Sequence, residues 1–326
     1  MGGYLEKRIA LIMACTKRKH GEVQPQMRFH SLGCMSTEQL VKEWAKRIKS
    51  TKRCFPVDKL YCGGGWAHSI GAYTKAQELF GNVSLYVLSA GLGLLSVENS
   101  IPPYSATFAP DPDQIAKHII ETDSVTEAHR KWWQMINMTL NNKPQNLSGL
   151  HYFDYIFLSA SADYLKAINN DLATLAEILG PERLSVTSVG VSPTSLDATV
   201  QQCLLPIDIS IETILPGPRS TINQRTLHWI FDIVLPNVKL DISLIRSEID
   251  KQMVACHMAQ ASQLKREINK MNDEEIIKWI QLQISGDQDI SKYKLLRNFR
   301  QSRSCEQKRF SKLIDVVRHK MNGATS

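Results

Sequence analysis

Four carboxylate side chains are candidates for the chemistry of this chain: Glu98, Asp111, Asp113 and Asp163. A carboxylate can stabilise a developing positive charge or activate a water molecule. Each of the four follows a segment that reads as a buried strand, and ligands of open α/β sheets bind beyond the carboxyl ends of the strands. We therefore expect them near one edge of a sheet, and the residue pattern does not choose among them. The structural alternative is a carboxylate that only favours a helix N-terminus.

Small and polar residues at the same strand ends are expected to form a pocket. Some follow the apolar run 83–88, and three glycines follow a strand expected over 57–62. A missing side chain lets the backbone approach a ligand closely. The ordinary alternatives are structural: a tyrosine packed in the core, a serine whose hydroxyl is hydrogen-bonded within the fold, and a histidine that caps a helix. The glycine pattern matches neither a P-loop nor a dinucleotide-binding motif. The expected pocket residues are Cys15, Gly63, Gly64, Gly65, His68, Ser89, Gly91, Tyr104 and Ser105.

Two polar stretches at element ends suit an anion. The first leaves a strand expected over 9–14, where backbone amides and cations can hold a phosphate. The second, residues 216–225, leads into a helix whose N-terminus attracts negative charge. A solvated basic loop and plain helix capping would explain the same residues. The candidate phosphate ligands are Lys17, Arg18, Lys19, Arg219, Asn223 and Arg225.

Positive charge is concentrated near the two ends of the sequence. Of the formal net charge of +7, residues 291–320 carry +8 and residues 6–53 carry another +8, which leaves about −9 for the remainder. Two basic ends around an acidic body favour a polyanionic partner, and we interpret the clustering as a nucleic-acid signal. Solvated helix faces are the alternative. The candidate DNA ligands near the C-terminus are Arg297, Arg300, Arg303 and Arg309.

The elements that must position these residues alternate between strands and helices. Apolar runs predict strands at 9–14, 57–62, 83–88, 155–159 and 184–189, and helical spacing with capping boxes predicts helices at 36–50 and 124–140. Beyond residue 236 the β signal stops, and helices are expected over 240–270, 273–284 and 293–321. The pattern predicts an α/β domain with an open parallel sheet over residues 1–238 and a helical, basic region over 239–326.

Length and composition limit the remaining possibilities. The 326 residues are 43% hydrophobic, which is enough for a real core, and no apolar run approaches the roughly 20 residues that a membrane span needs. We expect a cytoplasmic protein with no membrane partner. Seven cysteines without a CxxC pair argue against a disulfide framework and a zinc ribbon. We expect neither a metal nor an organic cofactor.

Three segments carry a resemblance to a known family: ALIMACTKRK, LSAGLGLLS and IPPYSATF. They resemble a bacterial and phage family of uncharacterised α/β proteins whose first strand ends in Ser/Ala-Cys-x-x-Lys-Lys and whose third strand leads into Ser-Ala-x-x-Gly-Leu. That family is similar to the accessory domain of archaeosine synthases and, more distantly, to the uracil-DNA glycosylase fold. Some relatives act as anti-phage DNA glycosylases that remove hypermodified bases. The segments GPRSTINQR and CEQKRF also resemble parts of these relatives.

The resemblance implies a fold like that of uracil-DNA glycosylase and a DNA glycosylase that hydrolyses the N-glycosidic bond of a modified base in phage or other foreign DNA. Such an enzyme needs a pocket for an extruded base, a carboxylate and cations for the flanking phosphates. Tyr104 would stack on the base. Ser105 stands where many relatives have an acid, and the Gly-Gln-Asp-Pro-Tyr-His signature of true uracil-DNA glycosylases is missing, so their catalytic residues are not carried over.

Two other classes of function stay open at this point. A nucleotide or nucleobase transferase of a base-modification pathway would use the same pocket for a soluble substrate. A non-catalytic DNA-binding defence protein would explain the basic C-terminal segment without any chemistry.

Overall fold

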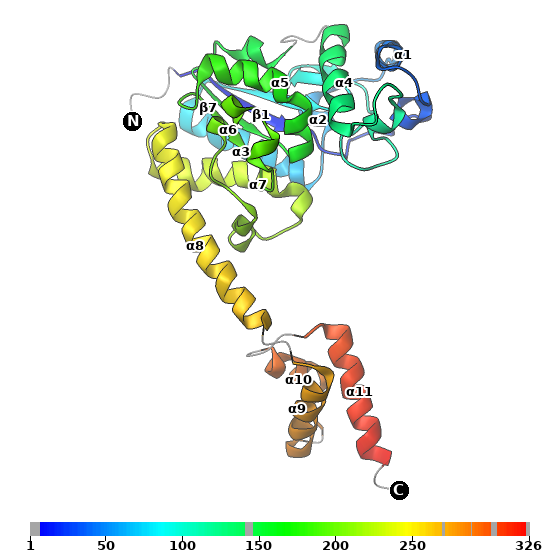
Figure 1. Cartoon of the computed structure of the whole chain (residues 1–326), viewed down its shortest axis with the longest axis vertical. Coiled ribbons are helices and arrows are strands. Elements are labelled where there is room, and N and C mark those ends of the chain that lie inside the picture. The colour runs from blue at the N-terminus through cyan, green and yellow to red at the C-terminus, as the bar shows by residue number, and fades with distance from the viewer. Residues whose placement is uncertain (1–6, 141–145, 269–270, 288, 301–304, 324–326) are drawn as a thin grey trace. The chain divides into compact units, whose positions relative to one another are not determined.

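The computed structural model of the chain describes residues 7–140, 146–268, 271–287, 289–300 and 305–323 (Figure 1). The chain divides into two compact units, Met1–Val254 and Ala255–Ser326. The boundary between them falls inside the helix α8 (Ile242–Ile268). The first unit is an α/β layer structure, and the second consists of helices.

A five-stranded sheet forms the centre of the first unit, with the strand order β4-β3-β1-β6-β7. Strands β1, β3, β6 and β7 are parallel, and β4 pairs antiparallel with β3 at one edge. The strands are β1 (Ile9–Ala14), β3 (Val83–Ser89), β4 (Gly93–Ser96), β6 (Tyr155–Ser159) and β7 (Leu184–Thr187), and a separate ribbon pairs β2 (Phe55–Pro56) with β5 (Ser100–Ile101). The expected α/β class is confirmed, whereas the expected parallel sheet is only mostly parallel, because β4 pairs antiparallel with β3.

The sheet is buried on both faces, as its continuous apolar runs require. All six residues of β1 are buried, and a parallel strand covered by helices on both sides has no polar face. Helix α4 packs against α1 and α5, whereas α3 packs against α7, and these groups lie on opposite sides of the sheet (Figure 1). The helices of this unit before α8 are α1 (Thr37–Ser50), α2 (Val57–Leu60), α3 (Gly64–Phe80), α4 (Val125–Leu140), α5 (Ala162–Leu179), α6 (Ala198–Cys203) and α7 (Ile222–Trp229).

Short turns complete the connections. They are the 3-10 turns η1 (Pro25–Met27), η2 (Phe29–Leu32), η3 (Ile115–His118), η4 (Leu147–Leu150), η5 (Pro193–Ser195), η6 (Ile209–Thr213), η7 (Arg219–Thr221) and η9 (Leu235–Asn237), and the π-helical turn η8 (Ile230–Val234). No helix of the described residues combines the length and the apolar character that a membrane crossing needs.

The strand expected over 57–62 is wrong. The chain forms the single helical turn α2 there, preceded by Pro56 at the N-cap position. Val57, Leu60 and Tyr61 are all buried, and their spacing of three and four residues places them on one helical face. A short apolar run is compatible with either a strand or a buried helical turn, and packing against the first unit's core decided between them.

The second unit has its own apolar core. Helices α9 (Asp273–Gly286), α10 (Lys292–Phe299) and α11 (Gln307–Gly323) pack around a cluster that contains Ile280, Phe299 and Phe310. The rings of Phe299 and Phe310 are 4.8 Å apart, and Trp279 lies 5.1 Å from Phe299. The helical character expected beyond residue 240 is confirmed, with the expected segment 293–321 divided into α10 and α11.

The turn after β3 is held by side chains from distant parts of the chain. Indole N–H groups of Trp44 and Trp132 donate to the carbonyl oxygens of Gly91 (2.7 Å) and Ala90 (2.6 Å). The Tyr104 ring lies directly against Gly91, and its hydroxyl contacts Ser89 Oγ at 2.5 Å. Gly91 is therefore a position of close approach, where any larger residue would displace Tyr104.

We expect the change Gly91→Ala to destabilise the first unit by about 1–3 kcal/mol, because an added Cβ would lie 2.7 Å from the Tyr104 ring, which two hydrogen bonds prevent from moving. Urea unfolding followed by tryptophan fluorescence measures this, since five of the six tryptophans belong to the first unit. The matched control is Gly64→Ala, where a Cβ meets nothing within 4 Å. Equal unfolding midpoints for the two variants would contradict the packing argument.

Candidate functional site

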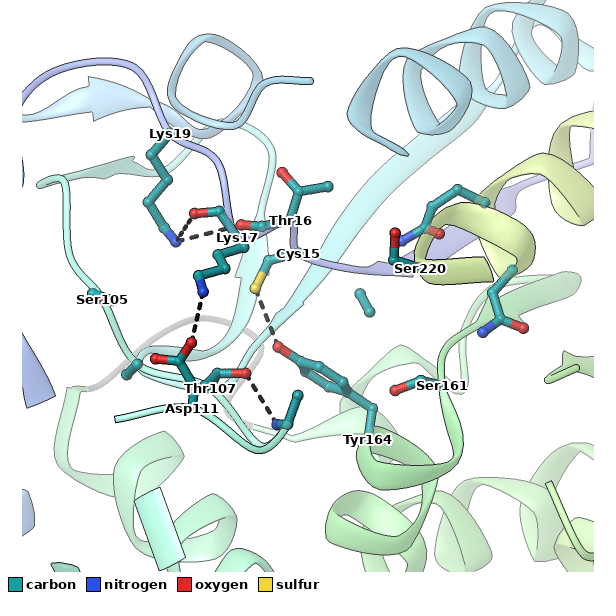
Figure 2. Close-up of a pocket in the computed structure, with 15 residues that line it drawn as sticks. Cys15, Thr16, Lys17, Lys19, Ser105, Thr107, Asp111, Ser161, Tyr164 and Ser220 are labelled. Atoms are coloured by element: carbon teal, nitrogen blue, oxygen red, sulfur yellow. Dashed lines mark hydrogen bonds and ion pairs between the residues drawn. The ribbon is translucent and has the colours of Figure 1, made fainter. Parts of the chain in front are cut away.

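A polar cavity of about 170 Å³ opens at the carboxyl end of β1 (Figure 2). Four segments far apart in the sequence form its wall: the loop after β1, the loop 105–111, the start of α5 and the start of α7. The lining residues are Ala14, Cys15, Thr16, Lys17, Lys19, Ser105, Ala106, Thr107, Ala109, Asp111, Ser161, Tyr164, Ser220, Asn223 and Gln224.

The topology of the sheet explains why the cavity forms here. After β1 the chain moves to β3 on one side, and it later returns to β6 on the other side of β1. The loops that leave β1 and β6 therefore diverge, and the crevice at such a reversal of strand order is the usual ligand site of an open α/β sheet. Residues that follow both strands, among them Cys15 and Ser161, line the cavity.

Asp111 and Lys17 form an ion pair in the cavity wall. The Lys17 ammonium donates to Asp111 Oδ2 at 2.6 Å, and the Asp113 N–H donates to Oδ1 at 3.0 Å. The hydrogen bond from Lys17, followed by that from the Asp113 N–H, lowers the pKa of Asp111. Asp111 is therefore an ionised carboxylate at neutral pH. Figure 2 shows it facing the lysines of the β1 loop.

Cys15 and Tyr164 meet inside the cavity. Their sulfur and hydroxyl oxygen are 3.2 Å apart, and either group can donate the hydrogen bond. Burial raises the pKa of Tyr164 well above its ordinary value, so the phenol stays neutral. The ring of Tyr164 packs edge-on against Phe108 with the centroids 5.0 Å apart. Tyr164 thus offers the cavity a fixed aromatic wall that carries a neutral hydroxyl.

Lys19 is the second cation in the wall. Its ammonium donates to the carbonyl oxygens of Thr16 (3.4 Å) and Lys17 (3.5 Å) and lies 4.3 Å above the centre of the Tyr104 ring. Burial lowers the pKa of Lys19, while negative charge on Cys15 or Cys62 would act in the opposite direction. Lys19 differs from Lys17 in this respect, because no carboxylate of the described residues lies within ion-pair distance of it.

The start of α7 closes the remaining side of the cavity. Asn223 connects it to the sheet: its backbone carbonyl accepts from Ser159 Oγ at 2.9 Å, and its side-chain oxygen accepts from the Val189 N–H at 2.7 Å. A Cβ on Gly65 of α3 would stand 3.4 Å from methyl groups of Thr16 and Thr221. The small residue therefore lets α3 support both the β1 loop and the α7 start from behind.

Of the predicted site residues, the structure brings six to the cavity: Cys15, Lys17, Lys19, Ser105, Asp111 and Asn223. The other three candidate carboxylates lie elsewhere. Glu98 is exposed beyond β4, and because β4 runs antiparallel to β3, the neighbouring Val97 pairs with Leu85 in the amino-terminal half of β3. Asp163 is exposed in the first turn of α5.

Asp113 is a buried structural carboxylate. It accepts from the backbone N–H of His30 at 2.9 Å and contacts His30 Nδ1 at 2.6 Å. Burial by itself would raise the pKa of Asp113, but the hydrogen bonds from the His30 N–H, from Ser105 and from the His30 ring outweigh it and lower the pKa. The carboxylate fastens the segment around His30 to the loop that carries Asp111.

Most of the other expected pocket residues have structural roles outside the cavity. The expectation that Tyr104 stacks on a ligand is wrong, because Tyr104 is 1% exposed, covered by Gly91 on one side and by the Lys19 ammonium on the ring. Ser89 and Gly91 are buried beside it. The glycines Gly63, Gly64 and Gly65 begin α3, with Gly63 in the left-handed region at φ +90°, and His68 contacts His228 with their Nδ1 atoms 3.2 Å apart.

Some of the arginines that were predicted to bind phosphate are already bonded to other groups of the protein, and one is exposed. Arg225 is buried, and its guanidinium donates to the carbonyl oxygens of Leu215 and Pro218, so its expected phosphate contact is wrong. Arg219 pairs with Glu212 at 3.0 Å, and Arg18 is exposed with its aliphatic stem near Gly63.

In the second unit, Arg309 pairs with Asp273 at 2.5 Å and thereby joins the start of α11 to the start of α9. Arg309 was expected to contact DNA, but its guanidinium is engaged by a carboxylate of the second unit itself. Arg297 and Arg300 are exposed, and Arg300 also donates to the Cys305 carbonyl at 3.5 Å. Arg303 lies outside the described residues.

Sequence reasoning missed several lining residues, Tyr164 above all. Tyr164 stands one residue after Asp163 and one helical turn after Ser161, so the helix start that follows β6 carried the signal. Thr16 and Thr107 lie between predicted residues, and Ser220 and Gln224 belong to the segment 216–225 that was expected to hold an anion.

Two larger hollows lie away from the carboxyl ends of β1 and β6. One, of about 400 Å³, is lined by residues of α4 and α5 with Asp171, whose carboxylate accepts from Trp133 Nε1 and the Leu147 N–H. The other, of about 550 Å³, lies by the start of α8 beside Tyr155 and Arg246, and Arg246 donates to two carbonyl oxygens. Their charged groups serve the fold, so we place the candidate site at β1.

Comparisons with protein-family models, with curated proteins and with solved structures found no match to this chain. Among the residues that the structure describes, no group of three or more His, Cys, Asp or Glu side chains is arranged to hold a metal ion. The geometry of the cavity therefore carries the functional interpretation.

We expect Asp113→Asn to cost about 1–3 kcal/mol of stability at pH 7, because it removes a charged acceptor from the buried contact with His30. The pKa of Asp113 is lowered by folding, so its contribution is present above the unfolded aspartate pKa of about 3.9 and is lost as the pH falls through the folded pKa. Urea unfolding at pH 7 and below pH 4 measures this, with the exposed Asp163→Asn as control. A wild-type advantage over Asp113→Asn that is independent of pH would contradict the assignment.

Proposed function

We propose that this protein is a DNA glycosylase that hydrolyses the N-glycosidic bond of a modified base in phage or other foreign DNA. One observation carries the proposal: an ionised carboxylate, Asp111, stands in the wall of a ring-sized polar cavity at the point where the strand order reverses. The resemblance of the β1 and β3 loops to glycosylase-containing relatives supports it. We extend the proposal to the finer fold assignment, an open sheet like that of uracil-DNA glycosylase.

The size of the cavity suits one base. An engineered protein cavity of about 150 Å³ accommodates benzene, and drug-sized ligands need roughly 300 Å³ or more. The 170 Å³ at β1 is therefore the space of one heterocyclic ring, too small for a whole nucleotide. Enzymes that act on a base within DNA extrude it from the stack into such a pocket. Tyr164 would pack against the extruded ring, and Ser105, Ser161 and Asn223 would meet its polar edge.

The charges around the cavity suit the breaking of a glycosidic bond. As the bond from C1′ to the base lengthens, the sugar acquires oxocarbenium character, which a nearby carboxylate stabilises. Asp111 is ionised at neutral pH, as aspartates ordinarily are, and the hydrogen bonds from Lys17 and the Asp113 N–H lower its pKa further, so it can supply that charge. Lys17 is 79% exposed at its side chain, which leaves it able to meet a flanking phosphate as well.

The second unit would supply sequence-independent affinity for DNA. Residues 291–320 carry a formal charge of +8, and the exposed Arg297 and Arg300 belong to this segment. Contacts between cations and phosphates release counterions and make binding depend steeply on salt. A defence role would follow from the choice of substrate, since a bulky modified base distinguishes foreign DNA from host DNA.

We expect Asp111→Asn to slow base release by about 10²–10³-fold, because it removes the charge that stabilises the sugar cation and retains the shape. Stability should change by no more than about 1 kcal/mol, since the partner Lys17 is exposed. The measurement is single-turnover base release, by mass spectrometry, from duplexes that carry different modified bases, together with thermal melting. Glu98→Gln and Asp163→Asn, which lie outside the cavity, are the controls and should release base at the wild-type rate.

The same measurement separates the classes of function. Release of a free base with an abasic product supports the glycosylase. DNA that stays intact with every modification tested, while a free nucleobase or nucleotide is bound and converted, would instead support a transferase. Binding to DNA without any release would support a non-catalytic defence protein. Wild-type rates for Asp111→Asn would contradict the role of this carboxylate.

We expect the double change Arg297→Gln, Arg300→Gln to weaken DNA binding and to flatten the slope of log K against log salt by roughly 0.9 for each phosphate that the variant no longer neutralises. Fluorescence anisotropy with a labelled duplex at several salt concentrations measures the slope. The control is Lys75→Gln, a half-buried lysine of α3 that pairs with Glu78 and Asp232 in the first unit. An unchanged slope for the double variant would assign this face of the second unit a role other than DNA binding.

A further inference from the structure

We propose that the Lys19 amine is the nucleophile of this site, so that base removal proceeds through an imine between Lys19 and the sugar and is followed by cleavage of the DNA strand. The inference rests on the proposed function, because it names the nucleophile for the reaction proposed in the same cavity. It adds a second activity, that of a lyase acting on an abasic sugar.

The position of Lys19 distinguishes it from Lys17, the other lysine of the cavity. Both side chains reach into the site from the loop after β1 (Figure 2). Lys17 is exposed and paired with Asp111 at 2.6 Å. Lys19 is half-buried and has no carboxylate within ion-pair distance among the described residues. Its nitrogen therefore has no strong ionic partner to give up when it reacts.

The contacts that hold Lys19 are weak enough to be exchanged for a substrate. Its hydrogen bonds to the carbonyl oxygens of Thr16 and Lys17 measure 3.4 and 3.5 Å, at the long limit for such bonds. The rings of Tyr104 and Tyr61 lie beneath the nitrogen, with centroids at 4.3 and 5.4 Å. These two rings are buried and fixed by the contact between their hydroxyls at 2.8 Å. The side chain is thus supported from below and open toward the cavity that it lines.

The protonation state also suits a nucleophile. An amine attacks only in its neutral form, and desolvated lysines are the ones that proteins use to form imines. Burial lowers the pKa of Lys19, which increases its neutral fraction at a given pH. The ionised Asp111 in the same wall would stabilise the positive charge that develops on the sugar.

The reaction consumes one molecule of water and needs no redox partner. The Lys19 nitrogen forms a bond to C1′, while the bond from C1′ to the base breaks and the base leaves with its electron pair and takes up a proton. The nitrogen loses a proton, the C1′–O4′ bond opens with protonation of O4′, and a protonated imine joins Lys19 to the sugar. Loss of a proton from C2′ expels the 3′ phosphate. Water then hydrolyses the imine to an aldehyde and the free amine.

The plain structural alternative is that Lys19 only fastens the turn 16–19 and rests on Tyr104. The change Lys19→Arg separates the two roles, because arginine keeps a cation, hydrogen-bond donors and stacking on the ring but cannot form an imine. A lysine whose role is structural would therefore be replaced well by arginine, and a nucleophilic lysine would not.

The experiment traps the imine with cyanoborohydride, which reduces it to a stable amine. The full chain is incubated with two duplexes, one with a preformed abasic site and one with the modified base that the wild type releases. The variants are Lys19→Arg and, as a matched control on α3 outside the cavity lining, Lys75→Arg. We expect a covalent adduct from the wild type and from Lys75→Arg, with the sugar mapped to the peptide that contains Lys19. Lys19→Arg should form no adduct and release base at least about 100-fold more slowly.

The two duplexes keep the inference and the proposed function apart. An adduct on the abasic duplex that is mapped to Lys19 supports the nucleophile even if no modified base is released, and the proposed glycosylase would then be the part that fails. Base release that yields intact abasic DNA without an adduct leaves the glycosylase standing and overturns the role of Lys19. An adduct that survives Lys19→Arg, or that maps to another lysine of the wild type, overturns it as well. The mapping uses the wild-type chain and therefore does not depend on the folding of a variant.

Discussion

The buried hydroxyl of Tyr104 is the interaction on which the candidate site depends. It contacts Ser89 at the end of β3 at 2.5 Å and Tyr61, the residue after α2, at 2.8 Å. Burial raises the pKa of Tyr104, so the phenol stays neutral. Tyr104 begins the loop that continues to Asp111. The contacts of its hydroxyl therefore fix the position of the start of this loop relative to the sheet. The backbone of Ser105 then pairs with Met27 and Phe29, which fixes the direction of the loop across the end of β1.

A cavity formed from four separate segments needs each segment to be held independently. Asp113 holds the loop of Asp111 to His30. Asn223 holds the start of α7 to β6 and to the segment that follows β7. The contact between Cys15 and Tyr164 links the loop after β1 to α5. Each fastening group is buried or half-buried, so it acts where water cannot compete for its hydrogen bonds. The groups that face the cavity can therefore stay polar, because the surrounding contacts carry the stability.

The basic residues of the chain serve two different physical purposes. Arg225 and Arg309 lie where carbonyl or carboxylate oxygens surround the guanidinium, and a fork of N–H donors satisfies several such oxygens at once. Lys17, Arg297 and Arg300 keep their charge exposed to solvent, where it acts over about a Debye length on a polyanion. Net charge alone does not separate the two groups, since both contribute equally to the total of +7.

The sequence by itself determined the strands of the parallel sheet, the end of the β signal near residue 236 and the edge of the sheet at which the cavity opens. Those properties depend on local apolar runs and on a general rule of sheet topology. Only the tertiary structure decided that Asp111 faces the cavity while Asp113 is buried against His30, that Tyr104 is a support while Tyr164 is the wall, and that residues 57–60 form a helical turn. The partners of these side chains lie tens of residues away along the chain. The type of a residue does not show which distant group will pack against it, so the sequence pattern could not predict these contacts.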